Sequence, residues 1–360
     1  MATRLKDIAK SLNLSISTVS AALQNRSDIS DATRERVLKK VRELNYHPNS
    51  LARSLVTQRT HVLGVVVPDL SRSFFAEVIK GIDSLTSAAG YNLLLCNTGE
   101  NANREEQEVG TLLSRQVDGL IIASAHKPNS AAFYRRLSDI GVPVVLIDRR
   151  FPKMHFVGGD DERIGYIATK HLIDQGYRKI GHLSGPQNIS TAIGRRKGFL
   201  KALRQFDRQP SEHRILEVPY HRESGSFDAM QQLLSLADPP DAVFAASDPI
   251  AIGALQAILQ AGLQPGPQVG LIGVGNHRYG EYLCVPLSTV NQRCVEIGRT
   301  AASLLLKLVR EKQIKEPQTI LLEPELVIRA SSLRNAQAQR PSLVFKPGEP
   351  ADRPAIIRSR

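Results

Sequence analysis

The first sixty residues place apolar side chains at helical spacing. Leu5, Ile8, Ala9 and Leu12 fall at i, i+3, i+4 and i+7, which predicts a short amphipathic helix. Two further stripes predict a second and a third helix, with these inward residues: Val19, Ala22 and Leu23, then Val37, Leu38, Val41 and Leu44. Asn13 suits a tight turn between the first two helices. Spacing alone leaves two modules open, a helix-turn-helix and an ordinary three-helix bundle.

After residue 60 the pattern changes to apolar runs that alternate with helical stretches. Each run is rich in Val, Ile and Leu, as in strands of a parallel sheet that is covered on both faces. Two series occur along the chain: HVLGVVVPDL, YNLLLCNT, VDGLIIAS and VPVVLID, then RKIGHLSG, RILEVPY, AVFAASD and VGLIGVG. They predict two doubly wound lobes, in which ligands bind at the carboxyl ends of the strands.

The positive charge of the chain lies mainly at its two ends. The net charge is +12; residues 1–60 hold 11 lysines and arginines against 5 acidic residues, and residues 334–360 hold 6 against 2. A basic module of this size indicates an anionic partner such as the phosphates of nucleic acid. The Gln-, Arg- and Pro-rich tail is expected to be disordered or loosely docked. It either adds nonspecific affinity for DNA or is an inert extension.

Composition and motifs argue against several classes of protein. No apolar run is long enough to span a bilayer, and the charged start MATRLKDIAK is unlike a secretory signal. Cys96, Cys284 and Cys294 cannot pair completely and are expected to be core thiols in a reducing cytoplasm. The histidines lack metal-ligand spacing, and neither a phosphate-binding loop nor a G-x-S-x-G motif occurs. We therefore expect no enzymatic activity, no catalytic residue, no metal site and no cofactor.

Specific runs of residues decide between the possible modules. LKDIAKSLNLSISTVSAALQN and SDATRERVLKKVRELNYHPNSLARSLVTQRT together resemble the DNA-binding headpiece of the LacI/GalR family of bacterial transcription regulators. Further runs resemble the periplasmic-binding-protein-like core of that family: VVVPDLSRSFFAEVIKGID, RQVDGLIIAS, GVPVVLIDRR, SDPIAIGAL and PLSTVNQ. The resemblance implies a cytoplasmic, nucleoid-associated homodimer that represses transcription. It would bind a pseudo-palindromic double-stranded DNA operator under control of a small-molecule effector. The alternative is a solute-binding protein of a sugar transport system, which the basic headpiece and the absent signal disfavour.

The implied fold is an N-terminal all-α helix-turn-helix headpiece with a hinge helix, followed by an α/β two-lobed core of doubly wound parallel sheets. The implied parts are the headpiece at 1–47, the hinge helix and linker at 48–60, the effector-binding and dimerisation core at 61–333, and the basic tail at 334–360. The chain is expected to cross between the lobes near residues 159, 290 and 320. These crossings give an N-lobe of 61–159 and 291–320 and a C-lobe of 160–290 and 321–333.

The family pattern also implies which residues contact DNA. Ile16, Ser17 and Ala21 occupy the base-reading positions of the second helix, and four residues contact or approach phosphates: Thr18, Ser20, Asn25 and Arg26. Ala21 departs from the many relatives with Arg or His, so it offers only a methyl group to the major groove. Three hinge residues are expected in the minor groove, with the leucine as a wedge between base pairs: Ala52, Arg53 and Leu55. Alternatively, this segment is a structured linker whose leucine packs on the core.

The same resemblance places eight residues around the cleft between the lobes: Phe74, Phe75, Asp148, Asp160, Arg195, Phe227, Asp248 and Gly275. Arg195 leads because a guanidinium fork suits a polyol, a carboxylate or a phosphate, although a structural salt bridge is its alternative. Asp148 alternatively caps the element after its strand. Gly275 replaces an Asp of many sugar-binding relatives, which removes a carboxylate. With three more arginines expected nearby (Arg72, Arg149 and Arg196), the pocket would be net positive. We therefore hypothesise an acidic or phosphorylated sugar as the effector, with neutral sugars left open.

Overall fold

The computed structural model describes residues 4–23, 25–46, 59–126, 131–139, 141–220, 223–311 and 316–335. It separates into two compact units with the boundary after His61. The smaller unit is helical, and the larger contains two sheets of mostly parallel strands flanked by helices. The fold class predicted from the sequence is thereby confirmed. Residues 47–58, where the hinge helix is expected, and residues 336–360 of the tail lie outside the described residues.

The described part of the N-terminal unit contains three helices: α1 (Leu5–Leu12), α2 (Ile16–Leu23) and α3 (Asp31–Glu43). They enclose a small core whose buried members are Ile8, Ala9, Val19, Ala22 and Val37. Leu38 and Leu44, predicted to face inward, are instead 41% and 37% exposed. The reason is geometric, because the residue after Val37 is turned by about 100° around the helix axis. Leu44 lies at the C-cap, where the helix has already ended.

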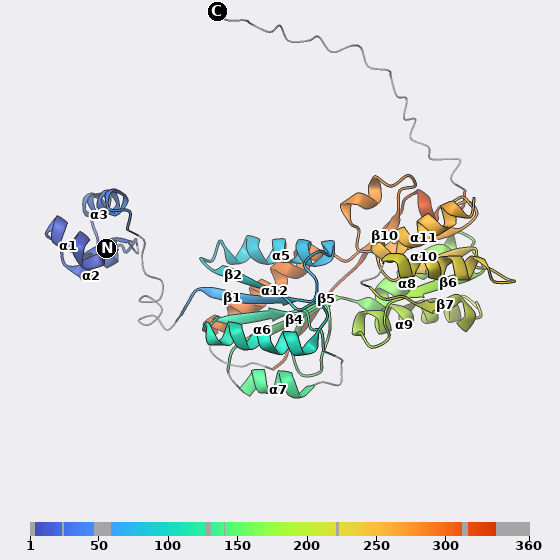
Figure 1. Cartoon of the computed structure of the whole chain (residues 1–360), viewed down its shortest axis with the longest axis horizontal. Helices are drawn as coiled ribbons and strands as arrows, with labels where there is room; N and C mark the ends of the chain where they lie inside the picture. Colours follow the sequence, from blue (N-terminus) through green and yellow to red (C-terminus); the bar gives the residue numbers. More distant parts are fainter. Residues whose placement is uncertain are drawn as a thin grey trace, which may run out of the picture. The chain divides into compact units, whose positions relative to one another are not determined.

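The N-lobe of the larger unit is built on a six-stranded parallel sheet in the order β11-β5-β4-β3-β1-β2. Its strands are β1 (Val62–Val67), β2 (Asn92–Asn97), β3 (Gly119–Ile122), β4 (Val144–Ile147), β5 (His155–Gly159) and β11 (Thr319–Leu322). Four helices cover the sheet, α5 (Ser73–Thr86) and α12 (Cys294–Glu311) on one face and α6 (Ala102–Ser114) and α7 (Ala131–Asp139) on the other (Figure 1). Because both faces are covered, every residue of β3 and β4 is buried.

The C-lobe repeats this plan around a sheet in the order β12-β10-β9-β8-β6-β7. Its strands are β6 (Ile180–Ser184), β7 (Ile215–Glu217), β8 (Ala242–Ala245), β9 (Gly270–Val274), β10 (Ser288–Asn291) and β12 (Glu325–Val327). Helices α10 (Glu223–Leu234) and α11 (Asp248–Gln260) pack on one face, and α8 (Asp161–Asp174) and α9 (Ser190–Gln205) on the other (Figure 1). Three 3-10 turns complete the described elements: η1 (Glu212–Arg214), η2 (Arg278–Glu281) and η3 (Ala330–Ser332). Strand β12 runs antiparallel to β10.

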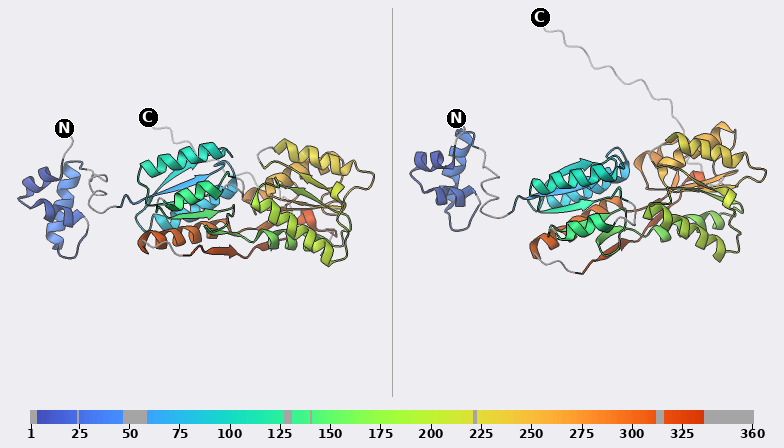
Figure 2. Two further views of the ribbon diagram at one scale, coloured as in Figure 1. Left: turned by 90° about the horizontal axis from the view of Figure 1, so that it is seen from below. Right: turned by 60° about the horizontal axis from the view of Figure 1, so that its bottom comes forward.

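The chain passes between the lobes three times, from β5 to α8, from β10 to α12 and from β11 to β12 (Figure 2). The third passage falls between Leu322 and Glu325, slightly beyond the expected position near residue 320. Strand β5 ends at Gly159, where the chain leaves the N-lobe, and β10 ends at Asn291, where it returns. The carboxyl ends of the parallel strands of both sheets therefore lie where the two lobes meet.

The cysteines differ in exposure. Cys294 is buried, Cys96 is half-buried and Cys284 is exposed. The prediction of core thiols is wrong for Cys284, because this residue lies in the irregular segment between η2 and β10. Within the described residues, no helix has the length and apolar character to cross a membrane.

Candidate functional site

The turn between α1 and α2 fixes the start of α2. Asn13 closes α1 in the left-handed conformation, with φ of 55°. Ser15 caps α2, since its Oγ accepts a hydrogen bond from the amide of Thr18 at 3.0 Å. The same Oγ lies 2.7 Å from Ser17 Oγ and 2.8 Å from Thr18 Oγ1. The first turn of α2 is thus held by a cluster of hydroxyl groups.

This turn presents two of the expected base-reading residues to solvent. Ser17 is exposed, and Ile16 is 53% exposed, which leaves its branched side chain open to an apolar contact such as a thymine methyl. Ala21 is half-buried. Of the expected phosphate contacts, Asn25 and Arg26 are exposed, whereas Thr18 and Ser20 are half-buried. Ala52, Arg53 and Leu55 lie outside the described residues, and all these roles stay predictions.

The second candidate site is a cavity of about 70 Å³ between the two lobes, called the inner cavity below. The N-lobe lines it with Arg72, Ser73, Phe74, Phe75, Asp148 and Arg149. The C-lobe and the β10–α12 passage line it with Thr191, Arg195, Tyr220, Ser247, Pro249, Val274, His277 and Gln292. Two larger cavities, of about 830 and 910 Å³, share part of this lining. Four of the eight residues expected around the cleft therefore line the inner cavity: Phe74, Phe75, Asp148 and Arg195.

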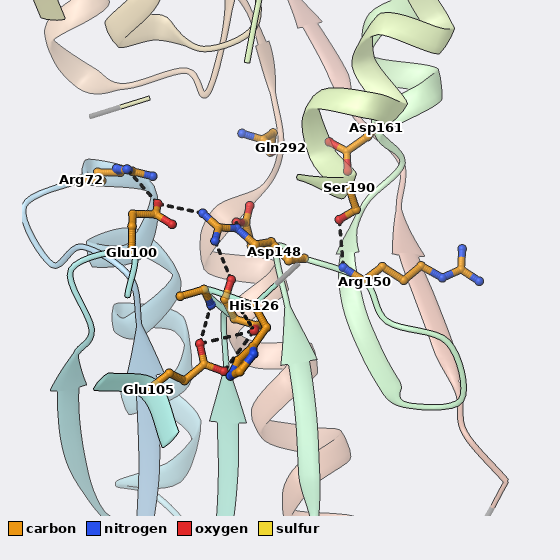
Figure 3. A network of polar contacts seen from close by, with 12 residues as sticks. Arg72, Glu100, Glu105, His126, Asp148, Arg150, Asp161, Ser190 and Gln292 are labelled. Carbon is orange, nitrogen blue, oxygen red and sulfur yellow. Dashed lines mark hydrogen bonds and ion pairs between the residues drawn. The ribbon is translucent and has the colours of Figure 1, made fainter. Parts of the chain in front are cut away.

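The two N-lobe arginines share one carboxylate (Figure 3). Glu100 Oε1 lies 3.0 Å from Arg72 Nη2 and 2.8 Å from Arg149 Nη2. Arg149 Nη1 also donates to the carbonyl oxygen of Ser124 at 2.6 Å. Both guanidinium groups are therefore held in place by the protein before any ligand arrives.

Arg195 is 4% exposed and has three protein partners. Its Nε donates to Asp161 Oδ1 at 2.9 Å, Nη1 to the Ala246 carbonyl at 2.7 Å, and Nη2 to Gln292 Oε1 at 2.7 Å. Helices α8 and α9 approach so closely that a Cβ on Gly165 would lie 2.0 Å from the Arg195 carbonyl oxygen. This packing brings Asp161 beside Arg195. The salt bridge considered as an alternative exists, and the same side chain lines the inner cavity.

Asp148 is the carboxylate with the fewest protein partners on this wall. It follows β4 in the left-handed region, with φ of 60°. Burial raises the pKa of its carboxyl group, although Arg149 and Arg195 oppose the shift. The nearest charged atom is Arg149 Nε at 3.6 Å, and no described residue donates a hydrogen bond to the carboxylate. Asp148 is thus open to accept hydrogen bonds from the hydroxyl groups of a ligand.

The remaining expected cleft residues lie elsewhere. Asp160 caps α8, because its Oδ1 accepts from the amide of Arg163 at 3.0 Å. Asp248 is 1% exposed and is used within the protein, so it does not line the inner cavity. Phe227 lines the neighbouring cavity of about 830 Å³, and Gly275 lines the one of about 910 Å³.

The site also contains residues that sequence reasoning missed. Asp161 directly follows a residue that was singled out, and burial raises the pKa of its carboxyl group to about 7 against the lowering effect of Arg195. Gln292 lies in the run PLSTVNQ, which carried the resemblance. Tyr220 stands across the cleft from Arg72, with 5.9 Å between the guanidinium carbon and the ring centre. His277 had no sequence signal beyond its nearness to Gly275.

Three of the four arginines expected around the cleft line the inner cavity, and the acidic side chain that lines it with them is Asp148. Arg72 and Arg149 share Glu100, Arg195 pairs with Asp161, and Asp148 stands beside them. Arg196 is not part of the cavity, because its Nη2 pairs with exposed Glu212 at 2.9 Å. The paired carboxylates Glu100 and Asp161 come from elements distant in the sequence from their arginines, so this pairing was not visible in the local motifs.

A buried carboxylate supports the N-lobe wall from below (Figure 3). Glu105 of α6 is fully buried and accepts from Ser124 Oγ at 3.0 Å, from the Tyr134 hydroxyl at 2.8 Å and from the amide of Ala125. Burial raises the pKa of its carboxyl group, and these hydrogen bonds oppose the shift. Since Ser124 also accepts from Arg149, Glu105 connects α6 and α7 to the wall of the inner cavity. Within the described residues there is no group of three or more His, Cys, Asp or Glu side chains that would hold a metal ion.

Comparison with known proteins covers both units. Residues 4–49 match the family described as "Bacterial regulatory proteins, lacI family", and residues 60–330 match "Periplasmic binding proteins and sugar binding domain of LacI family". The ribose operon repressor of Haemophilus influenzae is 36% identical to this chain, over 92% of this chain and 98% of that protein. The transcriptional repressor PurR of Mannheimia succiniciproducens is 34% identical, over 92% and 98%.

A solved structure agrees with these relatives. The lac repressor dimer bound to operator and the anti-inducer ONPF superimposes with a TM-score of 0.84 at 26% identity, over 92% of this chain and 100% of that one. The solute-binding alternative is not favoured, because the relatives that match along nearly the whole chain are repressors. The chain belongs to the LacI family of bacterial regulatory proteins and is a DNA-binding repressor with a small-molecule effector.

Proposed function

We propose that this repressor senses a sugar in the inner cavity. The observation that carries the proposal is the convergence of groups from both lobes on one cavity at the carboxyl ends of two sheets. Phe74 and Phe75 form an aromatic wall, with ring centres 5.1 Å apart and ring planes at 83°. Asp148 offers acceptors and the arginines offer donors to hydroxyl groups. A ligand that contacts both lobes couples its binding free energy to the lobe arrangement.

The charges favour a neutral sugar over a sugar acid or a sugar phosphate. Each of the three arginines of the inner cavity already has a carboxylate partner within 3.0 Å. Burial raises the pKa of Asp148 and of Asp161 although neighbouring arginines oppose the shift, and the same loss of solvation opposes the burial of an anionic ligand. A neutral polyol can use the remaining N–H and carboxylate positions without adding charge to the cavity.

On the DNA side, the proposal assigns base contacts to Ile16, Ser17 and Ala21. Thr18, Ser20, Asn25 and Arg26 approach phosphates, and Ala52, Arg53 and Leu55 enter the minor groove. The exposure of Ile16 and Ser17 at the start of α2 supports this assignment. The chain acts as a cytoplasmic, nucleoid-associated homodimer on a pseudo-palindromic operator, and the operator-bound dimer of the lac repressor supports this assembly.

A thermal-shift panel with the full chain tests the effector. D-ribose, D-xylose, D-glucose and D-fructose represent neutral sugars, and D-gluconate and D-ribose 5-phosphate represent anions. A neutral sugar present at one hundred times its Kd adds about 2.7 kcal/mol of stability. In the Asp148→Asn variant, which lacks the proposed acceptor, the sugar is expected to add no stability. Stabilisation by the anions alone would contradict the neutral-sugar proposal.

In vitro selection from random DNA duplexes at near-physiological salt tests the operator. We expect one palindromic site to be enriched in the presence or in the absence of the stabilising sugar. Ile16→Ala then weakens binding to that site by about 1 kcal/mol and leaves nonspecific binding unchanged. Enrichment of no sequence in either condition contradicts the assignment of α2 to base reading.

A further inference from the structure

On the C-lobe wall, the side chain of His277 lies next to Gly275, which has no side chain of its own. Gly275 follows β9 with φ of 140° and carries no side chain. A Cβ built on it would lie 2.8 Å from His277 Nε2 and 3.2 Å from Asp248 Oδ2. The imidazole ring of His277 therefore folds back over the glycine and stands where a side chain of residue 275 would begin.

A network of buried hydrogen bonds holds this loop in place. Asp248 Oδ2 accepts from the amide of His277 at 2.9 Å, and its Oδ1 accepts from Thr289 Oγ1 at 2.6 Å. Thr289 Oγ1 in turn accepts from the amide of Asn276 at 3.1 Å, and Asn276 Oδ1 accepts from Arg329 Nη2 at 2.9 Å. Asp248 is therefore a positioning residue that fixes the backbone of His277 from inside α11.

The ring that this network positions lies on the inner cavity. His277 lines it together with Arg195 and Gln292, and Phe74 of the N-lobe lines the same cavity. His277 is only 8% exposed, and the hydrogen bond that fixes it runs from its backbone amide to Asp248. The Tyr279 ring is a neighbour, with 5.4 Å between the ring centres. A buried imidazole that lines a cavity is suited to a hydrogen bond with a ligand.

The chemistry of this ring differs from that of a carboxylate at the same place. Burial lowers the pKa of His277, an effect that Asp248 and Glu77 oppose, so the neutral ring offers one donor and one acceptor. An ionised aspartate at residue 275 would offer acceptors alone.

We propose that His277 reads the effector from the C-lobe in the place of residue 275, through a hydrogen bond from a ring nitrogen to one oxygen of the sugar. This inference rests on the proposed sugar site. It predicts that the effector carries an oxygen that accepts a hydrogen bond at this end, which a hydroxyl, a ring oxygen or a carbonyl oxygen satisfies.

Isothermal titration calorimetry of the full-length chain with the four neutral sugars tests the inference. His277→Phe keeps an aromatic ring, larger by one atom, and removes both nitrogens, so we expect about a tenfold loss of affinity. His277→Gln keeps one donor and one acceptor and retains most of the affinity. The control His213→Phe changes an exposed histidine of η1 and leaves affinity unchanged. Thermal unfolding confirms that each variant is folded.

Monodeoxy analogues of the bound sugar locate the contact. When the analogue lacks the hydroxyl that His277 contacts, His277→Phe causes no further loss of affinity, because the hydrogen bond is already absent. If His277→Phe and His277→Gln bind as the wild type does while Asp148→Asn loses affinity, the sugar site stands and the role of His277 is wrong. If no neutral sugar binds, or if Asp148→Asn also leaves binding unchanged, the proposed sugar site fails and the inference fails with it.

Discussion

The two lobes hold the arginines of the inner cavity in different ways. In each lobe an arginine of the inner cavity donates to the carbonyl oxygen of a residue just after a central strand, Arg149 to Ser124 and Arg195 to Ala246. In the C-lobe the chain then enters α11 directly, with Ser247 as the N-cap. In the N-lobe the described residues that follow β3, 123–126, are not helical, and two of them donate hydrogen bonds to the buried side chain of Glu105.

The arginines also differ in their acidic partners. Arg195 pairs with Asp161, which comes from a tightly packed helix and serves no second arginine among the described residues. Arg149 shares Glu100 with Arg72, and Glu100 lies in the turn between β2 and α6. The C-lobe wall is therefore held by the packing of its helices, whereas the N-lobe wall is held by contacts between residues that lie outside helices and strands. The N-lobe wall is the one we expect to adjust to a ligand.

The largest expected effect is a difference in stability between variants of Arg195 and of Arg149. Arg195→Met removes the partner of half-buried Asp161 and of buried Gln292, so we expect the free energy of unfolding to fall by about 3–5 kcal/mol. Arg149→Met leaves Glu100 paired with Arg72, and we expect a fall of about 1–2 kcal/mol. Both variants lose effector binding. Urea unfolding measures the difference, and equal losses of stability would break the distinction between the two walls.

The sequence predicts the strands better than the partners within the site. An apolar run such as VDGLIIAS is stable in a sheet that is covered on both faces, and every residue of the corresponding strand, β3, is buried. The partners of Arg195 lie 34 and 97 positions away, at a distance that no local pattern reveals. Asp160 and Asp161 are adjacent acids, and the start of α8 decides which caps the helix and which turns to the arginine. The sequence tells us that residue 275 is a glycine without a side chain, but only the structure places the ring of His277 beside it.

The second prediction concerns the pH dependence of the C-lobe wall. Burial raises the pKa of Asp161 from 3.8 to about 7, so the folded state holds this proton over a range in which the unfolded chain releases it. The contribution of this group is therefore fully present below pH 3.8 and is lost as the pH rises to about 7, by up to about 4 kcal/mol. Asp161→Asn abolishes that part of the slope. Unfolding measured from pH 4 to 8 checks it, with exposed Asp174→Asn as the control; a wild-type slope in Asp161→Asn would contradict the assignment.

The third prediction concerns the support of the N-lobe wall. Glu105→Gln keeps the shape of the side chain but loses an acceptor for the amide of Ala125 or the hydroxyl of Ser124. We expect a loss of about 1–2 kcal/mol in stability and a weaker effector affinity, because the Ser124 carbonyl positions Arg149. Glu106→Gln changes the exposed neighbour and is the matched control. If both variants bind the effector alike, the N-lobe wall does not depend on Glu105.

The smallest expected effect tests whether the two walls communicate. The amide of Arg150, which follows β4 of the N-lobe, donates to Ser190 Oγ at the start of α9 of the C-lobe at 3.0 Å (Figure 3). This exposed bond joins the lobes in the arrangement described here, and its loss costs about 0.5 kcal/mol. If the sugar binds that arrangement preferentially, Ser190→Ala lowers its affinity about twofold without changing the contacts to the sugar. Ser235→Ala removes a comparable hydroxyl that bonds only within the C-lobe, to the Gln231 carbonyl, and leaves affinity unchanged. Calorimetry on the two variants therefore distinguishes a coupled pair of walls from two walls that bind independently, because only coupling allows a bond outside the inner cavity to affect the affinity for the sugar.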